Sequence, residues 1–196
     1  MDETGNTKDA NRTGSRVSGL TVRRVLWING WAMVLIFSLG LAYFQHQRHQ
    51  INRLIVEAAE KHGLDPRLVS AVVWKESRYQ KDAQGTVGEI GLMQVRPSTA
   101  MDWARITKVE AFEDVDLFDP RVNLDAGCWY LARGHKKWSE TKSDPWPWVL
   151  SQYNAGPSRV NRWDEGVGDD PESFIADIPF ATTKEYVVDI LARWRN

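Results

Sequence analysis

The sequence from Asp65 to Tyr79, DPRLVSAVVWKESRY, decides the fold because it describes one short, strongly apolar helix. Asp65 is a favourable helix N-cap, and the proline that follows suits the first helical position, where no backbone N–H is needed. The next apolar side chains recur at three- and four-residue steps, namely Leu68, Val69, Val72 and Val73. This spacing places them on one helix face. We therefore expect a central helix that ends in the polar run from Lys75 to Tyr79.

The rest of the chain shows similar helical patterns. On the N-terminal side, Ile51 to Ala59 carry an apolar face that Gly63 would end. On the C-terminal side, glycines predict a loop around Gly85, Gly88 and Gly91. Further helices are expected from Ser98 as N-cap through Trp103, from Val122 to Trp138 after Asp119-Pro120, from Pro147 through Tyr153, after Asp170-Pro171, and from Thr183 to Trp194. Strand alternation is nowhere sustained. The sequence thus predicts a mainly α fold with one compact domain over residues 45–196.

The composition excludes several classes of protein. The formal net charge of -1 offers no basic surface for a phosphate backbone, so we expect no nucleic-acid partner. Cys128 is the only cysteine, which rules out an intramolecular disulfide and a cysteine-based metal cluster. The four histidines lack metal-ligand spacing such as HExxH. We therefore expect neither a metal nor an organic cofactor.

The stretch from Val25 to Phe44 carries no formal charge and is mostly apolar. About 20 helical residues match a hydrocarbon core of roughly 30 Å, so we expect a single transmembrane anchor here. Arg23 and Arg24 precede it. By the positive-inside rule, residues 1–24 would then be a disordered cytoplasmic tail, and the C-terminal bulk would cross the membrane. A cleaved signal peptide followed by secretion is the alternative, and a buried core helix is a third interpretation.

Glu76 is the candidate catalytic residue in the central helix. It follows Trp74 by two residues at the end of the apolar face. A carboxyl group held against apolar surface resists ionisation, which raises its pKa. Such a group can act as a general acid near neutral pH. An isolated glutamate near a helix end is more often a solvated surface residue, so other parts of the sequence have to decide.

Four short sequence motifs, which occur in a fixed order, favour a catalytic role for Glu76. They are Glu76-Ser77-Arg78-Tyr79, Gly91-Leu92-Met93-Gln94, Tyr153-Asn154-Ala155-Gly156, and a closing Ile178-Pro179-Phe180 with Thr183, Tyr186 and Val187. Over about residues 55–190 the chain resembles the soluble lytic transglycosylase family of peptidoglycan-cleaving enzymes. The resemblance implies a lysozyme-like helical fold. Together with the expected anchor, it implies a place in the bacterial inner membrane with the catalytic domain in the periplasm.

The resemblance also implies the reaction and its substrate, the glycan strands of peptidoglycan. Glu76 matches the family's catalytic carboxylate, which would protonate the glycosidic oxygen between N-acetylmuramic acid and N-acetylglucosamine. It would then act as base on the muramic C6 hydroxyl, whose attack on the anomeric carbon leaves a 1,6-anhydromuramic end and consumes no water. Ordinary glycosidases use two carboxylates, whereas an intramolecular hydroxyl at high effective concentration lets one acid/base suffice.

Several other residues match family site positions. Tyr153 matches the tyrosine that hydrogen-bonds the catalytic carboxyl, so we expect it to be part of the catalytic machinery. The expected substrate-binding residues are Ser77, Gly91, Met93, Gln94, Asn154 and Tyr186. Of these, Gln94 is expected to make a polar contact with a sugar.

The chain departs from the family pattern at three positions. Gly85 stands where the family often has serine, Glu89 where it often has alanine, and Thr182 where it frequently has glutamate. Glu89 places a second carboxylate in the loop of the expected groove. We expect an exposed loop acid here. As a second catalytic group it would instead suit a hydrolase of the lysozyme kind.

Two other functions compete with the transglycosylase. One is a hydrolytic muramidase, and the other is a peptidoglycan-binding module without activity, against which the intact Glu76, Gln94 and Tyr153-Asn154 argue. An anchored enzyme without binding repeats would also suit an envelope-spanning complex that needs a local opening in the wall. The sequence leaves open endo or exo cleavage, processing of the anchor, and the oligomeric state.

Overall fold

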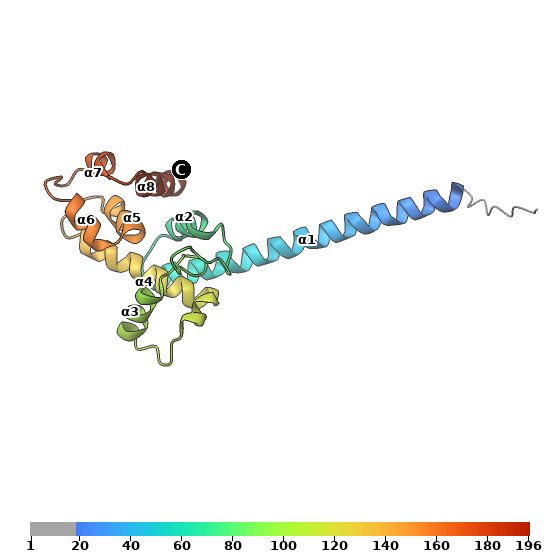
Figure 1. Cartoon of the computed structure of the whole chain (residues 1–196), viewed down its shortest axis with the longest axis horizontal. Coiled ribbons are helices and arrows are strands. Elements are labelled where there is room, and N and C mark those ends of the chain that lie inside the picture. Colours follow the sequence, from blue (N-terminus) through green and yellow to red (C-terminus); the bar gives the residue numbers. More distant parts are fainter. Residues whose placement is uncertain (1–18) are drawn as a thin grey trace, which may run out of the picture. The chain divides into compact units, whose positions relative to one another are not determined.

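The structure, a computed structural model, describes residues 19–196. Side chains are described from Trp27 onward, except at Ile28, Gly30 and Ala32. Contacts divide the chain into two units, Met1–His46 and Gln47–Asn196. Figure 1 shows the elements in colours that follow the sequence. The second unit contains every candidate site residue.

The first unit contains the start of helix α1 (Gly19–Lys61). Residues 19–24 are helical where a disordered tail is expected, because no proline or glycine separates them from the apolar residues that follow; residues 1–18 lie outside the described part. Within this first unit, the large apolar side chains of α1 that the structure describes are exposed, including Trp31 at 67% and Phe37 at 74%. Among the residues that the structure describes, no helix has both the length and the apolar character that crossing a membrane requires. The expected anchor at 25–44 lies partly outside the described side chains, at positions 25, 26, 28, 30 and 32.

The second unit consists of the end of α1 and a series of short helices. In chain order these are α2 (Pro66–Ser77), α3 (Pro97–Thr107), the 3₁₀ helix η1 (Asp114–Phe118), α4 (Pro120–Trp138), α5 (Trp146–Ala155), α6 (Pro157–Trp163), α7 (Pro171–Asp177) and α8 (Ala181–Arg195). Extended pairing within the described part is limited to isolated bridges in the loop between α2 and α3. The prediction of a mainly α fold is confirmed.

Aspartate, proline and glycine set several helix boundaries as the sequence predicts. Asp65 accepts a hydrogen bond from the backbone N–H of Arg67 at the start of α2. Asp119 and Asp170 cap α4 and α7 in the same way, each followed by proline. Gly63 follows the end of α1 with a φ of 67°, a conformation that favours glycine.

Some helix boundaries and two elements differ from the sequence prediction. Helix α3 begins at Pro97 with Arg96 as its N-cap, so Ser98 lies in the first turn instead of capping the helix. The fixed φ of proline suits the first helical position, which explains the difference. Gly156 ends α5, and Pro157 at once begins α6, a helix that the sequence patterns do not predict. Helix η1 is a second element that the sequence pattern does not reveal.

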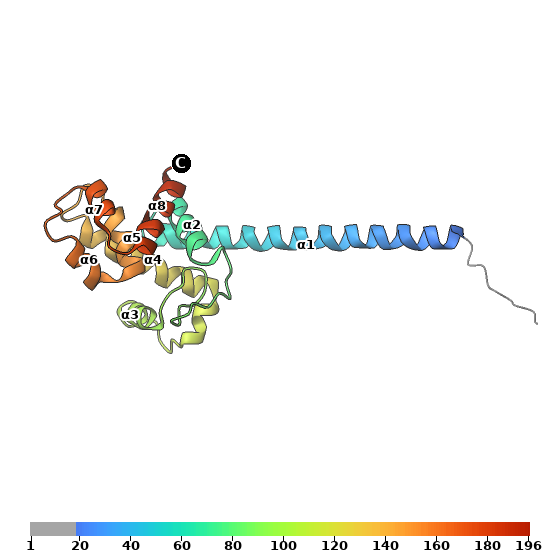
Figure 2. The same cartoon turned by 45° about the horizontal axis from the view of Figure 1, so that its top comes forward.

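Helix α2 is the central helix that the sequence predicts. Its residues Leu68, Val69, Val72 and Val73 are fully buried. Helix α2 packs against α8, α8 also packs against α5, and α5 packs on α4. In both Figure 1 and Figure 2, α3 lies on one side of α4 and α8 on the other. This packing places the C-terminal end of α2, which carries Glu76, next to α8.

Candidate active site

Glu76 lies in the last turn of α2 with its side chain partly buried. The hydroxyl of Tyr186, from α8, donates a hydrogen bond to Glu76 Oε1 over 2.6 Å. Tyr186 itself is only 4% exposed, so this contact is sheltered from water. The contact joins residues 110 positions apart and follows from the packing of α2 on α8.

The surroundings of Glu76 favour its protonated form. Burial raises the pKa of Glu76 from 4.5 to about 7. The Tyr186 hydrogen bond and the charge of Lys75 lower that pKa, and the charge of Glu89 adds to the rise. The net result is the carboxyl of raised pKa that the sequence predicts, suited to give and take a proton near neutral pH.

Ser77 connects the end of α2 to the loop that follows. Its hydroxyl donates to the backbone oxygens of Val73, at 3.2 Å, and Leu92, at 2.8 Å. The side chain is 6% exposed and does not line a pocket beside Glu76. Ser77 therefore holds the end of α2 against the loop, and its contact with substrate stays a prediction.

The loop between α2 and α3 is held by Asn123 on α4, whose side chain is fully buried. Its amide oxygen accepts from the backbone N–H of Met93, and its amide nitrogen donates to the backbone oxygens of Ile90 and Leu117. Gly91 adopts a φ of 78°, and a Cβ there would lie 2.3 Å from the Asn123 amide nitrogen. Only glycine fits this close approach.

Gly91 and Met93 therefore shape the loop from inside. Met93 is fully buried and would contact a Cβ added at Gly127 on α4. Neither Gly91 nor Met93 lines the pocket beside Glu76. Their role as direct substrate contacts stays a prediction.

The expected hydrogen bond from Tyr153 to Glu76 is a wrong prediction for this structure. The Tyr153 hydroxyl donates instead to the backbone oxygen of Met93 over 2.9 Å. Burial and the nearby charge of Glu76 raise the pKa of Tyr153 well above its ordinary value. The phenol that donates to Glu76 comes from Tyr186, because α8 reaches the carboxyl and the Tyr153 hydroxyl is already bonded to the loop.

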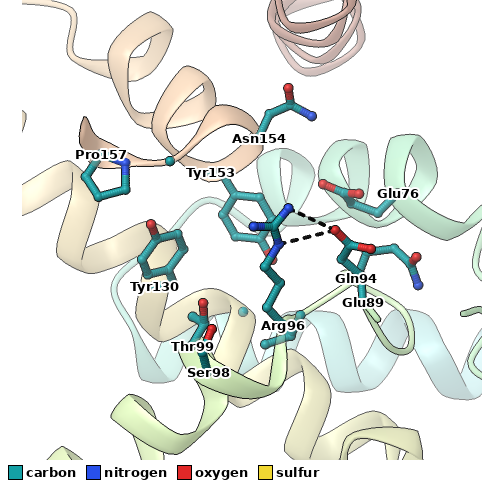
Figure 3. A pocket seen from close by; sticks show the side chains of 13 residues that line it. Glu76, Glu89, Gln94, Arg96, Ser98, Thr99, Tyr130, Tyr153, Asn154 and Pro157 are labelled. Carbon is teal, nitrogen blue, oxygen red and sulfur yellow. Dashed lines mark hydrogen bonds and ion pairs between the residues drawn. The ribbon is translucent and has the colours of Figure 1, made fainter. Parts of the chain in front are cut away.

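A pocket of about 300 Å³ opens beside Glu76, and Figure 3 shows its lining side chains. The lining comprises Glu76, Glu89, Gln94, Val95, Arg96, Ser98, Thr99, Gly127, Tyr130, Tyr153, Asn154, Gly156 and Pro157. Of the residues expected at the site, the pocket thus brings together Glu76, Gln94, Tyr153 and Asn154. Tyr186 does not line the pocket, but it donates a hydrogen bond to Glu76, which does.

Gln94 and Asn154 combine a place in the pocket with hydrogen bonds to the fold. Gln94 has a φ of 47°, and its amide nitrogen donates to the backbone oxygens of Ala83 and Gly91. The amide oxygen of Asn154 accepts from the hydroxyl of Thr183 on α8. Both side chains are therefore fixed in place at the pocket wall.

Sequence reasoning missed Arg96, Ser98, Thr99, Tyr130 and Pro157 as pocket residues. Tyr130 packs its ring on Tyr153, with centroids 5.6 Å apart. A signal existed for Arg96, which lies two residues after Gln94 in a loop that also holds an unmatched acid. Tyr130 lies in a stretch that resembles the family's helix before the Tyr-Asn block, but that stretch does not indicate a place in the pocket, which depends on the packing of α4 on α5.

Glu89 is not the exposed loop acid that we expect from the sequence. Its side chain is 17% exposed, and its carboxylate forms an ion pair of 3.1 Å with Arg96. It lines the same pocket as Glu76. In the described part of the chain, no group of His, Cys, Asp and Glu side chains is placed to hold a metal ion.

Comparison with known proteins explains this arrangement. The family model described as the transglycosylase SLT domain matches residues 53–174. The chain belongs to the transglycosylase SLT domain family. The matched range includes Glu76, the loop and both tyrosines of the pocket, whereas Tyr186 follows it.

Two curated relatives of this SLT domain are lytic murein transglycosylases. The soluble lytic murein transglycosylase of Escherichia coli K12 is 30% identical over 125 residues, which are 62% of this chain and 19% of that protein. The membrane-bound lytic murein transglycosylase F of Desulfosudis oleivorans is 31% identical over 145 residues, 69% of this chain and 30% of that protein. The chain thus spans about a fifth to a third of the length of these relatives.

A solved structure is similar in fold. The lytic transglycosylase Slt of Pseudomonas aeruginosa, crystallised as an inactive mutant, superposes with a TM-score of 0.66 at 30% identity. The match covers 72% of this chain and 22% of that chain. The lysozyme-like helical fold that the sequence blocks imply is confirmed for this SLT domain.

Proposed function

We propose that this SLT domain is a lytic transglycosylase. It cleaves the β-1,4 bond between N-acetylmuramic acid and N-acetylglucosamine in peptidoglycan and leaves a 1,6-anhydromuramic end. The observation that carries the proposal is the place of Glu76, largely buried on the wall of a pocket and hydrogen-bonded by Tyr186. This burial raises the pKa of Glu76 to about 7. The names of the two curated relatives support murein as the substrate class.

One residue serves both halves of the proposed reaction. Protonated Glu76 gives its proton to the glycosidic oxygen, which leaves as the C4 hydroxyl of N-acetylglucosamine. The resulting carboxylate takes the proton from the muramic C6 hydroxyl as that oxygen attacks the anomeric carbon. A pKa near 7 suits a group that must act first as acid and then as base. The sugar's own hydroxyl is already beside the reacting carbon, so water is not required.

A hydrolytic muramidase is the second candidate, and Glu89 is the observation that favours it. A second carboxylate lines the same pocket, as the reaction of ordinary glycosidases demands. In the structure, however, Glu89 is bound to the guanidinium of Arg96. A carboxylate held by two guanidinium hydrogen bonds is less available to a substrate than an unbound one, so we favour the transglycosylase.

Product analysis on purified sacculi tests the proposal. We expect the full chain to release fragments that are lighter by one water than hydrolysis products and that lack a reducing end. Glu76→Gln should abolish their release. Asp82→Asn is a matched control, because Asp82 is an exposed acid just after α2 that does not line the pocket. Fragments with reducing ends would establish the muramidase, and sacculus binding without any fragments would establish the inactive binding module.

We also propose that the first unit anchors the domain in the bacterial inner membrane, with the domain in the periplasm. The support is the series of exposed apolar side chains on α1, such as Leu35, Phe37 and Phe44, which water solvates poorly. Arg23 and Arg24 before them favour a cytoplasmic N-terminus. The same anchoring would be compatible with a place within an envelope-spanning complex.

Cell fractionation tests the anchor. The full chain should stay with membranes after alkaline carbonate extraction, and its C-terminus should be open to protease in spheroplasts. Replacing Leu35, Phe37 and Leu39 with glutamate should release it from the membrane. Quantitative recovery of the unchanged chain in the medium would instead establish signal cleavage and secretion.

A further inference from the structure

Two of the departures from the family pattern are physically linked in the structure. A Cβ added at Gly85 would lie 2.3 Å from Glu89 Oε2, closer than real Cβ atoms approach. The backbone N–H of Gly85 also donates to the backbone oxygen of Glu89 over 2.7 Å. The Glu89 carboxylate therefore occupies the space that a side chain at position 85 would fill.

Arg96 and the loop backbone hold the same carboxylate. The Nε and Nη2 atoms of Arg96 donate to Glu89 Oε1 over 3.2 and 3.1 Å. The backbone N–H of Val87 donates to Oε2 over 3.3 Å. Figure 3 shows Arg96 reaching into the pocket toward Glu89, with Glu76 on the same wall. The Glu89 carboxylate thus accepts hydrogen bonds from three donor atoms on two residues.

We propose that Glu89 is a positioning residue for the proposed reaction: its carboxylate, lodged in the space left at Gly85 and held by Arg96, keeps the proton on Glu76. The inference rests on the proposed function. A negative charge nearby disfavours ionisation of Glu76, and the guanidinium of Arg96 limits the strength of this effect.

The other groups that face Glu76 do not favour its protonated form. Tyr186 on α8 donates to the carboxyl, which favours the charged form. Lys75 on α2 also favours the charged form, but its ammonium is bound by Asp189 at 2.5 Å and by Glu185 at 3.3 Å. Tyr153 on α5 is neutral, because its pKa is raised well above the ordinary value. Within the part of the chain that the structure describes, Glu89 is the one anion whose charge favours the protonated form of Glu76.

Three substitutions separate charge from shape. Glu89→Gln removes the charge and keeps the size of the side chain. Gly85→Ala changes no charge, but its new methyl group displaces the end of the flexible Glu89 side chain, which it would approach to 2.3 Å. It would also lie 2.9 Å from Gln94 Oε1, an uncharged group. Arg96→Gln leaves the charge of Glu89 without its counterion. If the charge of Glu89 keeps Glu76 protonated, Glu89→Gln and Gly85→Ala lower the pKa of Glu76, and Arg96→Gln raises it.

The test is a pH titration of the Glu76 carboxyl in the full chain, with infrared difference spectroscopy as the readout. The reference for each variant is the same variant with Glu76→Gln added. We expect Glu89→Gln and Gly85→Ala to lower the midpoint by roughly half a pH unit, and Arg96→Gln to raise it. Gly85→Ala should add nothing in the Glu89→Gln background. Asp82→Asn should leave the midpoint in place. The alkaline limb of turnover on sacculi should move with each midpoint.

An unchanged midpoint in folded Glu89→Gln overturns the proposal, as does a Gly85→Ala effect that persists without Glu89. If Glu89→Gln abolishes turnover while the midpoint stays, Glu89 takes part in the bond-breaking step itself, which also overturns the proposal. The titration needs no turnover, so failure of the proposed function would be recognised separately from product masses. Should Gly85→Ala fail to fold, Glu89→Gln and Arg96→Gln still decide.

Discussion

Glu76 and Glu89 are two carboxyl groups on one pocket, and they differ in what surrounds them. Glu76 lies at the end of a buried helix and accepts from the phenol of Tyr186. Glu89 lies in a glycine-rich loop and binds the guanidinium of Arg96. Burial without a nearby free cation favours a neutral carboxyl, whereas a guanidinium favours a carboxylate. The comparison teaches that the neighbours, more than the residue type, decide which group can act as the acid.

The largest expected effect comes from removing the acid itself. Glu76→Gln keeps the size of the side chain and its ability to accept from Tyr186, so the fold should persist. Turnover on sacculi should fall by at least about 10³-fold, because general acid–base catalysis is lost. Glu89→Gln should cost far less. Equal losses in both variants would mean that the two carboxyl groups share the chemistry.

Removing the support of the loop should have the next largest effect. Asn123→Ala leaves the Met93 N–H and the oxygens of Ile90 and Leu117 without their buried partner. We expect a loss of about 3 kcal/mol in the free energy of unfolding, measured in urea. Asn161→Ala is the control, since the exposed Asn161 pairs only with Lys137 at the surface, and it should cost little. Similar stability in the two variants would show that Asn123 does not hold the loop.

The raised pKa of Glu76 should also appear in the stability of the fold. Since the folded-state pKa of about 7 lies above the unfolded value near 4.5, the stabilising effect of this group is complete below pH 4.5. It is lost as the pH rises to 7. Glu76→Gln carries no such group, so relative to wild type it should gain about 3 kcal/mol between pH 4.5 and 8. Urea unfolding at both pH values measures the difference, and a gap that is constant with pH would contradict the account.

The two tyrosines offer the smallest but most selective comparison. Each phenylalanine substitution removes one hydrogen bond, worth about 1 kcal/mol of stability. Only Tyr186→Phe should move the alkaline limb of turnover to higher pH, because the Tyr186 hydrogen bond lowers the pKa of Glu76. Tyr153→Phe should leave the limb in place, since its hydroxyl donates to Met93. A shift in Tyr153→Phe alone would restore the assignment made from the sequence.

Local sequence patterns were sufficient for the helices and for part of the site. Asp65-Pro66 and the apolar spacing after it predict α2, and the position of Glu76 at its end predicts a raised pKa. The motif blocks correctly bring Gln94 and Asn154 to the pocket. These features depend on helix caps, periodicity and short motifs, which a sequence displays directly.

The remaining features depend on contacts between distant segments. Tyr186 reaches Glu76 only because α8 packs on α2, and Tyr130 reaches the pocket only because α4 packs on α5. Ser77 and Met93 stand in motif blocks but face inward, since the loop needs them to hold its shape. A motif therefore identifies the residues of a site without separating those that line it from those that support it.

The titration of the Glu76 carboxyl in the wild-type chain tests the central claim most directly. Infrared difference spectra against Glu76→Gln report the C=O stretch of the protonated group as the pH changes. We predict a midpoint of about 7, with the carboxyl still largely protonated at pH 6. A midpoint near 4.5 would contradict the account, because Glu76 would then hold no proton to donate at neutral pH.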